Sequence, residues 1–93
     1  MRLAHQEQLA IRDTIHHVDA DAMIYLFGSR TDDTAKGGDI DLLVLSKTIN
    51  LIAKLDILTQ LHQRLGERKI DIAVYPDTMR PFPRMAMQTG ILL

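Results

Sequence analysis

Three short apolar runs constrain the fold of this chain more strongly than any other feature. They occupy residues 22–27, 40–45 and 69–75, and each is too short for a typical helix. Gly28 ends the first run and Pro76 ends the third, which is typical of buried strands. Carboxylates are set into the second and third runs, although burial in a strand strips an ionised carboxylate of its hydration. The runs therefore predict a sheet whose acidic residues bind a cation.

Two longer segments have the spacing of amphipathic helices. Residues 3–19 place apolar side chains at helical intervals, and residues 50–65 begin at Asn50, a candidate N-cap, and end at Gly66. The apolar stripe expected on the second helix consists of Leu51, Leu55, Leu58, His62 and Leu65. A polar turn and loop are expected over 29–38, and a short helix in the tail. The order helix, strand, turn, strand, helix, strand, helix predicts an α/β domain.

Composition bounds the possible functions. The 93 residues suffice for one domain, expected to span 1–93, and 46% hydrophobic with 25% charged residues is ordinary for a globular chain. The formal net charge of -1 gives no basic field for nucleic acid or a membrane, so a polyanionic ligand must be held locally. The absence of cysteine excludes disulfides and thiolate metal sites. The first 15 residues lack the apolar core of a signal peptide, so we expect a cytoplasmic protein.

Asp39 and Asp41 form an Asp-x-Asp pair at the start of the second apolar run. In a strand, residues two apart project to the same face, and their side chains start about 7 Å apart. Oxygen ligands without nearby histidine or cysteine suit Mg²⁺ or Mn²⁺, and paired carboxylates hold the two ions of phosphoryl-transfer sites. The alternative is that the pair only solvates a strand start after Gly37 and Gly38. From the Asp-x-Asp pair alone, we favour this alternative.

Asp71 changes this balance, because it lies among β-branched neighbours in the third run. If the third strand pairs beside the second, Asp71 lies next to Asp39 and Asp41 on one face. Three clustered carboxylates repel one another unless a cation neutralises them, so the cluster predicts a metal ion. The alternative is an edge strand with Asp71 facing water. We favour the metal site.

Gly28 and Ser29 follow the first strand and begin the polar turn. Glycine permits close backbone approach, and exposed amides at a helix start attract phosphate oxygens. The hydroxyl of Ser29 adds a donor, while Arg30 is equally compatible with a phosphate contact and with simple exposure. A glycine–serine pair after a strand is by itself ordinarily only a turn. The spacing matches neither a Walker phosphate loop nor an EF-hand.

Taken together, these motifs are a Gly-Ser pair at 28–29, nine intervening residues, Asp39-Ile40-Asp41, and Asp71 on a later strand. This arrangement resembles the nucleotidyltransferase superfamily that includes DNA polymerase beta, and most closely its minimal nucleotidyltransferases. The resemblance covers residues 25–74 and extends to the tail at 83–90. Many members place ten residues between the serine and the first aspartate, a difference that a loop absorbs readily.

The resemblance implies a small mixed β-sheet flanked by helices. It also implies that Asp39 and Asp41 are ligands of two Mg²⁺ ions, with Mn²⁺ as a possible substitute. Asp71 would bind the catalytic ion and act as general base, and Gly28 and Ser29 would hold the triphosphate of an incoming nucleotide. The chemistry would be in-line transfer of a nucleoside monophosphate, with pyrophosphate leaving.

Family members of this size are often encoded beside a helical HEPN-domain protein and act as its antitoxin, some by adding AMP from ATP to a tyrosine of the toxin. We therefore expect a HEPN-domain partner that this protein adenylylates. The protein is expected to form a homo-oligomer or a hetero-oligomer. The alternative is a non-catalytic subunit that binds nucleotide or masks the partner by contact. The presence of all three carboxylates favours catalysis.

Overall fold

The computed structural model describes residues 3–28, 39–66 and 68–93, which form a four-stranded mixed sheet and three helices. The expected loop over 29–38, with Ser29 and Arg30, lies outside the described residues. The elements in chain order are α1 (His5–Val18), β1 (Met23–Phe27), β2 (Ile40–Leu45), α2 (Leu51–Leu65), β3 (Ile70–Tyr75), α3 (Pro81–Thr89) and β4 (Ile91–Leu92). The expected small mixed sheet flanked by helices is confirmed.

The sheet has the strand order β3-β2-β1-β4. β1 pairs with β2 and with β4 in antiparallel orientation, whereas β2 and β3 are parallel. Parallel neighbours need a long crossover, and α2 supplies it between β2 and β3. As a consequence, β2 and β3 both begin at the sheet end where β1 finishes.

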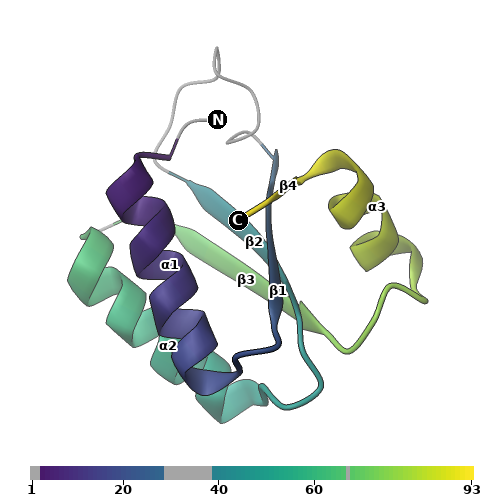
Figure 1. Ribbon diagram of the computed structural model, residues 1–93, viewed down its shortest axis with the longest axis horizontal. Helices are drawn as coiled ribbons and strands as arrows, with labels where there is room; N and C mark the ends of the chain where they lie inside the picture. Colours follow the sequence, from purple (N-terminus) through teal and green to yellow (C-terminus); the bar gives the residue numbers. More distant parts are fainter. Residues whose placement is uncertain (1–2, 29–38, 67) are drawn as a thin grey trace.

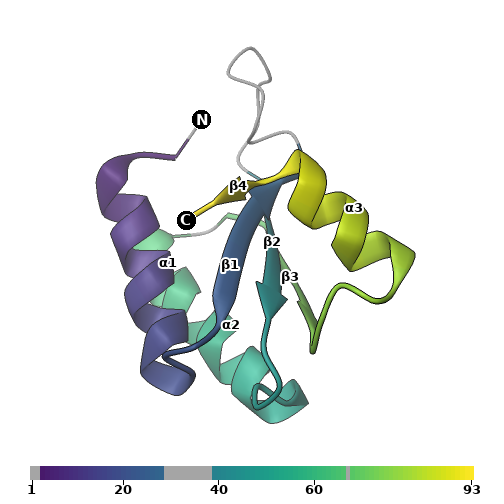
Figure 2. The ribbon, with the colours of Figure 1, turned by 45° about the vertical axis from the view of Figure 1, so that its right-hand side comes forward.

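The helices cover the two faces of the sheet unequally. α1 and α2 lie together on one face and α3 lies on the other (Figures 1 and 2). The larger core, which includes Ile11, Ile57, Leu61 and Leu42, fills the side of α1 and α2. A smaller cluster of Tyr25, Leu43 and Ala86 lies under α3, with Phe27, Leu45, Tyr75 and Met87 packed against it. Alternate residues of β2 therefore serve two separate cores.

The ends of α2 match the sequence signals. The side chain of Asn50 accepts a hydrogen bond from the backbone N–H of Ala53 at 2.8 Å, so it is the N-cap. Gly66 follows the last turn with φ +83°, a conformation that glycine adopts at low cost, and its N–H donates to the carbonyl of His62. Within the described part of the chain, no helix is both long and apolar enough to cross a membrane.

The apolar stripe expected on α2 was partly wrong. Leu51 and Leu55 are exposed by 67% and 53%, and the residues that α2 buries are Ile57 and Leu61. Two apolar stripes run along this helix at the same period, and periodicity does not say which of them faces the sheet. Packing against α1 and β3 selects the stripe of Ile57 and Leu61.

The short strand β4 was not expected from the sequence. It adds to the free edge of β1, with Leu92 opposite Tyr25 and Ile91 opposite Leu26. The chain returns from α3 to β1 through Gly90, where a Cβ would lie 2.8 Å from the carbonyl oxygen of Leu26. Only glycine permits this close backbone approach, so Gly90 allows the chain that follows α3 to pair with β1.

Candidate active site

The described members of the predicted site, Gly28, Asp39, Asp41 and Asp71, lie at one end of the sheet. In the strand register, Phe27 of β1 is opposite Asp41 of β2, and Asp41 is opposite Asp71 of β3. Residues in direct register project to the same face, so the carboxylates of Asp41 and Asp71 are neighbours. Asp39 precedes β2 by one residue and is exposed. β3 is an edge strand and Asp71 is exposed to solvent, as the alternative held, yet the register places Asp71 beside Asp41 on one face.

The carboxylates lie on the face of the sheet that α3 covers. Leu43 is two residues after Asp41 in β2 and packs with Tyr25 and Ala86 under α3. By strand alternation Asp41 projects to the same side, beyond this cluster. The side chain of Asp71 is 60% exposed, so the acidic end of the face is open to solvent. A ligand can therefore reach the carboxylates beside α3.

Asp41 is the electrostatic centre of the cluster. Burial raises the pKa of its carboxyl above the usual value, and the charges of Asp71 and Asp39 raise it further. A hydrogen bond with the side chain of Asp71 acts in the same direction, because the protonated Asp41 donates to the neighbouring carboxylate, while Lys69 opposes the shift. Two carboxylates in hydrogen-bond contact favour a shared proton or a shared cation.

Lys69 is a site neighbour that the sequence interpretation missed. Its Nζ lies 3.9 Å from Oδ2 of Asp71, and both side chains are largely exposed, so the pair contributes little stability. Lys69 directly precedes β3 and stands two residues before Asp71, which is the spacing of residues on one strand face. This alternation was available from the sequence and would have identified the lysine.

Gly28 directly contacts the acidic cluster. Its φ is +75°, and a Cβ at this position would lie 2.7 Å from Oδ2 of Asp41. The backbone at the end of β1 therefore lies against the Asp41 carboxylate, which an added Cβ would displace. This contact joins the two sequence motifs, the glycine turn and the Asp-x-Asp pair, into one site.

The donor set fits a hard cation, although the described side chains do not form a ready cage. Within residues 3–28, 39–66 and 68–93, no three acidic or histidine side chains converge closely enough to enclose an ion. Asp41 and Asp71 are in contact, and Asp39 acts on Asp41 through its charge. These oxygen donors, with no histidine or cysteine among them, match the preference of Mg²⁺ and Mn²⁺.

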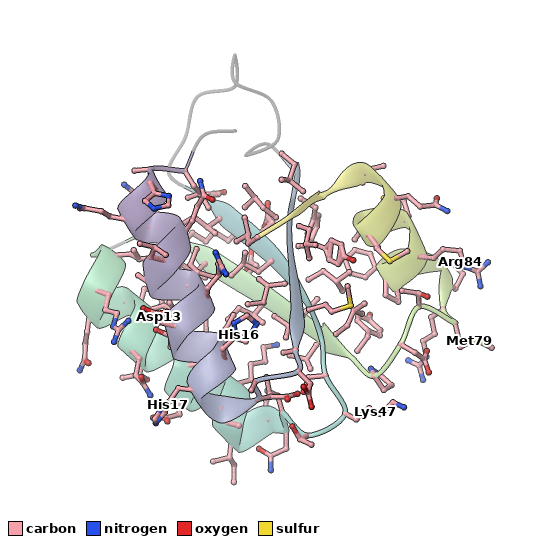
Figure 3. The ribbon with its side chains drawn as sticks, in the orientation of Figure 1. Asp13, His16, His17, Lys47, Met79 and Arg84 are labelled. Atoms are coloured by element: carbon pink, nitrogen blue, oxygen red, sulfur yellow. The ribbon has the colours of Figure 1, made fainter. Side chains whose placement is uncertain are left out.

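A cavity of about 370 Å³ lies at the opposite end of the sheet and is separate from the acidic cluster. Its lining includes Ser46, which follows β2, and Lys47, which is labelled at this end in Figure 3. The hydroxyl of Ser46 donates to Asp19 at 2.5 Å and accepts from the N–H of Ile49 at 3.1 Å. The hydrogen bond from Ser46 lowers the pKa of the Asp19 carboxyl. These hydrogen bonds stabilise the turns at this end of the sheet, so the polar groups here have a structural role.

The fold and the acidic end of its sheet define a nucleotidyltransferase-type domain. A family model described as polymerase beta, nucleotidyltransferase, matches residues 10–93, and the chain belongs to this family. The matched range contains the glycine turn and all three aspartates. A search of curated proteins found no match to the chain.

Asp41→Asn is expected to stabilise the metal-free protein at neutral pH. Because the folded state raises the pKa of Asp41, ionisation costs stability above the folded pKa, and this cost disappears as pH falls below the ordinary value of 3.8. Solvent screens the partly exposed group, so the expected gain at pH 7 is about 0.2–1 kcal/mol. Denaturant unfolding with a chelator at pH 7 and pH 3 measures it; an equal difference at both pH values would contradict the assignment.

Gly28→Ala is expected to destabilise the protein by about 1–3 kcal/mol, because alanine is strained at positive φ. The added Cβ also displaces the Asp41 carboxylate that it would contact at 2.7 Å. Gly66→Ala is the matched control, since Gly66 has φ +83° but nothing lies within 4 Å of its added Cβ. Nucleotide binding, measured on folded protein, should fall in the Gly28 variant alone. Equal loss in both variants would argue against a specific contact at Gly28.

Proposed function

We propose that this protein is a Mg²⁺-dependent nucleotidyltransferase that moves AMP from ATP onto a hydroxyl of a partner protein. Family membership supports nucleotidyl transfer. The observation that carries the proposal is the register of Asp41 and Asp71, which places the two carboxylates side by side at the open end of the sheet. A repulsive carboxylate pair with one half-buried member lowers the stability of the free protein, and a ligand that neutralises the pair would offset this cost.

Each residue has a proposed role. Asp39 and Asp41 hold two divalent cations, and Gly28, Ser29 and Arg30 hold the triphosphate. The cations, when bound, neutralise the phosphate charge and polarise the reacting oxygens. Asp71 orients the acceptor hydroxyl and takes its proton. The acceptor oxygen forms a bond to the α-phosphorus, the bond from that phosphorus to the bridging oxygen breaks, and pyrophosphate leaves.

A second protein is the acceptor that this site suits best. The side chain of Asp71 is 60% exposed at the open end of the sheet, and α3 is the only described element packed on that face. An open carboxylate reaches a hydroxyl on a large surface more easily than it encloses a small molecule. We propose a HEPN-domain protein as this partner, with the present chain as its antitoxin in a toxin–antitoxin pair.

One observation favours a second candidate function. The described side chains form no ready three-ligand cage, which is also what a subunit without catalytic activity would show. In this alternative, the protein binds nucleotide or covers the HEPN partner and neutralises it by contact alone.

Mass spectrometry of a HEPN-domain partner after incubation with this protein, ATP and Mg²⁺ separates the two functions. The proposal predicts that the partner gains the mass of AMP on a hydroxyl side chain as its toxicity falls. A partner that is bound and silenced, yet never gains a nucleotide from any of the four nucleoside triphosphates, would establish the masking function instead.

A further inference from the structure

A row of three contacting aromatic side chains begins beside the acidic cluster at Phe27 and ends at Tyr75, four residues after Asp71 in β3. Phe27 is opposite Asp41 in the β1–β2 register. The ring of Phe82 on α3 contacts Phe27 edge to face at 5.6 Å between centroids, and contacts Tyr75 at 5.8 Å. Phe27 and Tyr75 belong to the face that α3 covers, which is also the face of Asp41. The aromatic group and the carboxylates are therefore adjacent on one surface.

The ring of Phe82 is only partly buried. It is 37% exposed, and neither of its ring contacts is a parallel stack. The residue stands between Pro81 and Pro83 in the first turn of α3, and Pro83 is fully buried. The fixed φ of both prolines restrains the backbone on either side. Phe82 thus presents a partly exposed ring from a restrained backbone.

The ring of Phe82 is connected to the acidic cluster through Phe27. A cross-strand contact of about 5 Å joins Asp41 to Phe27, and a ring contact of similar length joins Phe27 to Phe82. A single side chain, that of Phe27, therefore links the Phe82 ring to the residue opposite Asp41. The groups proposed to bind the triphosphate do not contact the base, whereas an aromatic ring offers the base a surface for stacking.

We propose that Phe82 is the base platform of this site, on which the nucleobase of the bound nucleoside triphosphate stacks. The inference rests on the proposed nucleotidyl transfer and adds a positioning residue to it. Stacking fixes the nucleoside at one end while the triphosphate is held at the other, which aligns the α-phosphorus with the acceptor. Because every base has a π-face, this contact selects a nucleoside over a bare polyphosphate and discriminates weakly among bases.

Calorimetry with two ligands, ATP and inorganic tripolyphosphate, each with Mg²⁺, tests the platform. Phe82→Leu is expected to weaken ATP binding about 5- to 100-fold and to leave tripolyphosphate binding within about twofold. Phe82→Tyr, which keeps the ring, should retain ATP affinity. Met85→Leu is the matched control, because Met85 is an exposed apolar residue one turn further along α3 and should alter neither ligand. Thermal unfolding identifies any variant that is not folded.

The outcomes separate this inference from the function on which it rests. Equal ATP affinity in the wild type and the folded Phe82→Leu variant would overturn the platform, as would equal weakening of both ligands. Similar wild-type affinity for ATP and tripolyphosphate would overturn it too, because the base would then contribute nothing. If the folded wild type binds neither ligand, the proposed nucleotidyl transfer itself fails.

Discussion

Asp71→Asn is expected to abolish AMP transfer, lowering its rate about 10²–10⁴-fold, while the protein remains folded and still binds Mg²⁺ and ATP. Asparagine has nearly the shape of aspartate but does not accept the proton of the acceptor hydroxyl. Asp71 is exposed, so its substitution leaves the buried core intact. Single-turnover transfer measured with nucleotide binding and thermal unfolding separates the catalytic loss from a loss of structure.

Asp13→Asn is the matched control for this variant. Asp13 is an exposed aspartate of α1, on the other face of the sheet from Asp71 (Figure 3). The substitution removes the same charge from the protein, and transfer should persist. If Asp71→Asn retained the wild-type rate, Asp71 would have no catalytic role. If both variants lost activity equally, the loss would follow net charge.

The double variant Asp39→Asn, Asp41→Asn is expected to lose Mg²⁺-dependent nucleotide binding by more than about 100-fold, because the proposed metal ligands themselves are removed. Without the carboxylate charges, nothing in the cluster offsets the desolvation of a divalent cation. Calorimetric titration of ATP, with Mg²⁺ and with a chelator, measures the metal-dependent part of the affinity.

The same double variant should be at least as stable as the wild type in the absence of metal, because the repulsion that raises the pKa of Asp41 is gone. Lost binding together with retained stability is the pattern expected of a functional site. Unchanged affinity would mean that the Asp-x-Asp pair only solvates the start of β2.

The strands and the acidic end of the sheet could be predicted from the sequence for identifiable reasons. β1, β2 and β3 coincide with apolar runs ended by Gly28 and Pro76, which are strong local signals. The pairing of Asp41 with Asp71 follows once β2 and β3 are parallel neighbours joined by α2. The sequence pattern therefore predicted that Asp41 and Asp71 are neighbours once the third strand pairs with the second.

Other features depend on tertiary packing, and the local sequence pattern does not predict them. The buried stripe of α2 is decided by its contacts with α1 and β3, so the exposed Leu51 and Leu55 were misplaced. β4 is only two residues long and forms because Gly90 brings the chain against β1. The contact of Phe82 with Phe27 joins residues 55 positions apart, a pairing that periodicity does not predict.

Transfer of label from ATP to a HEPN-domain partner is the measurement that tests the central claim most directly. ATP labelled at the α-phosphate and ATP labelled at the γ-phosphate are compared with Mg²⁺, with a chelator and with Asp71→Asn. Nucleotidyl transfer predicts that the partner gains the α-label alone, only with the metal and only with the wild-type protein. Transfer of the γ-label, or no transfer of either label by folded protein with its bound partner, would contradict the account.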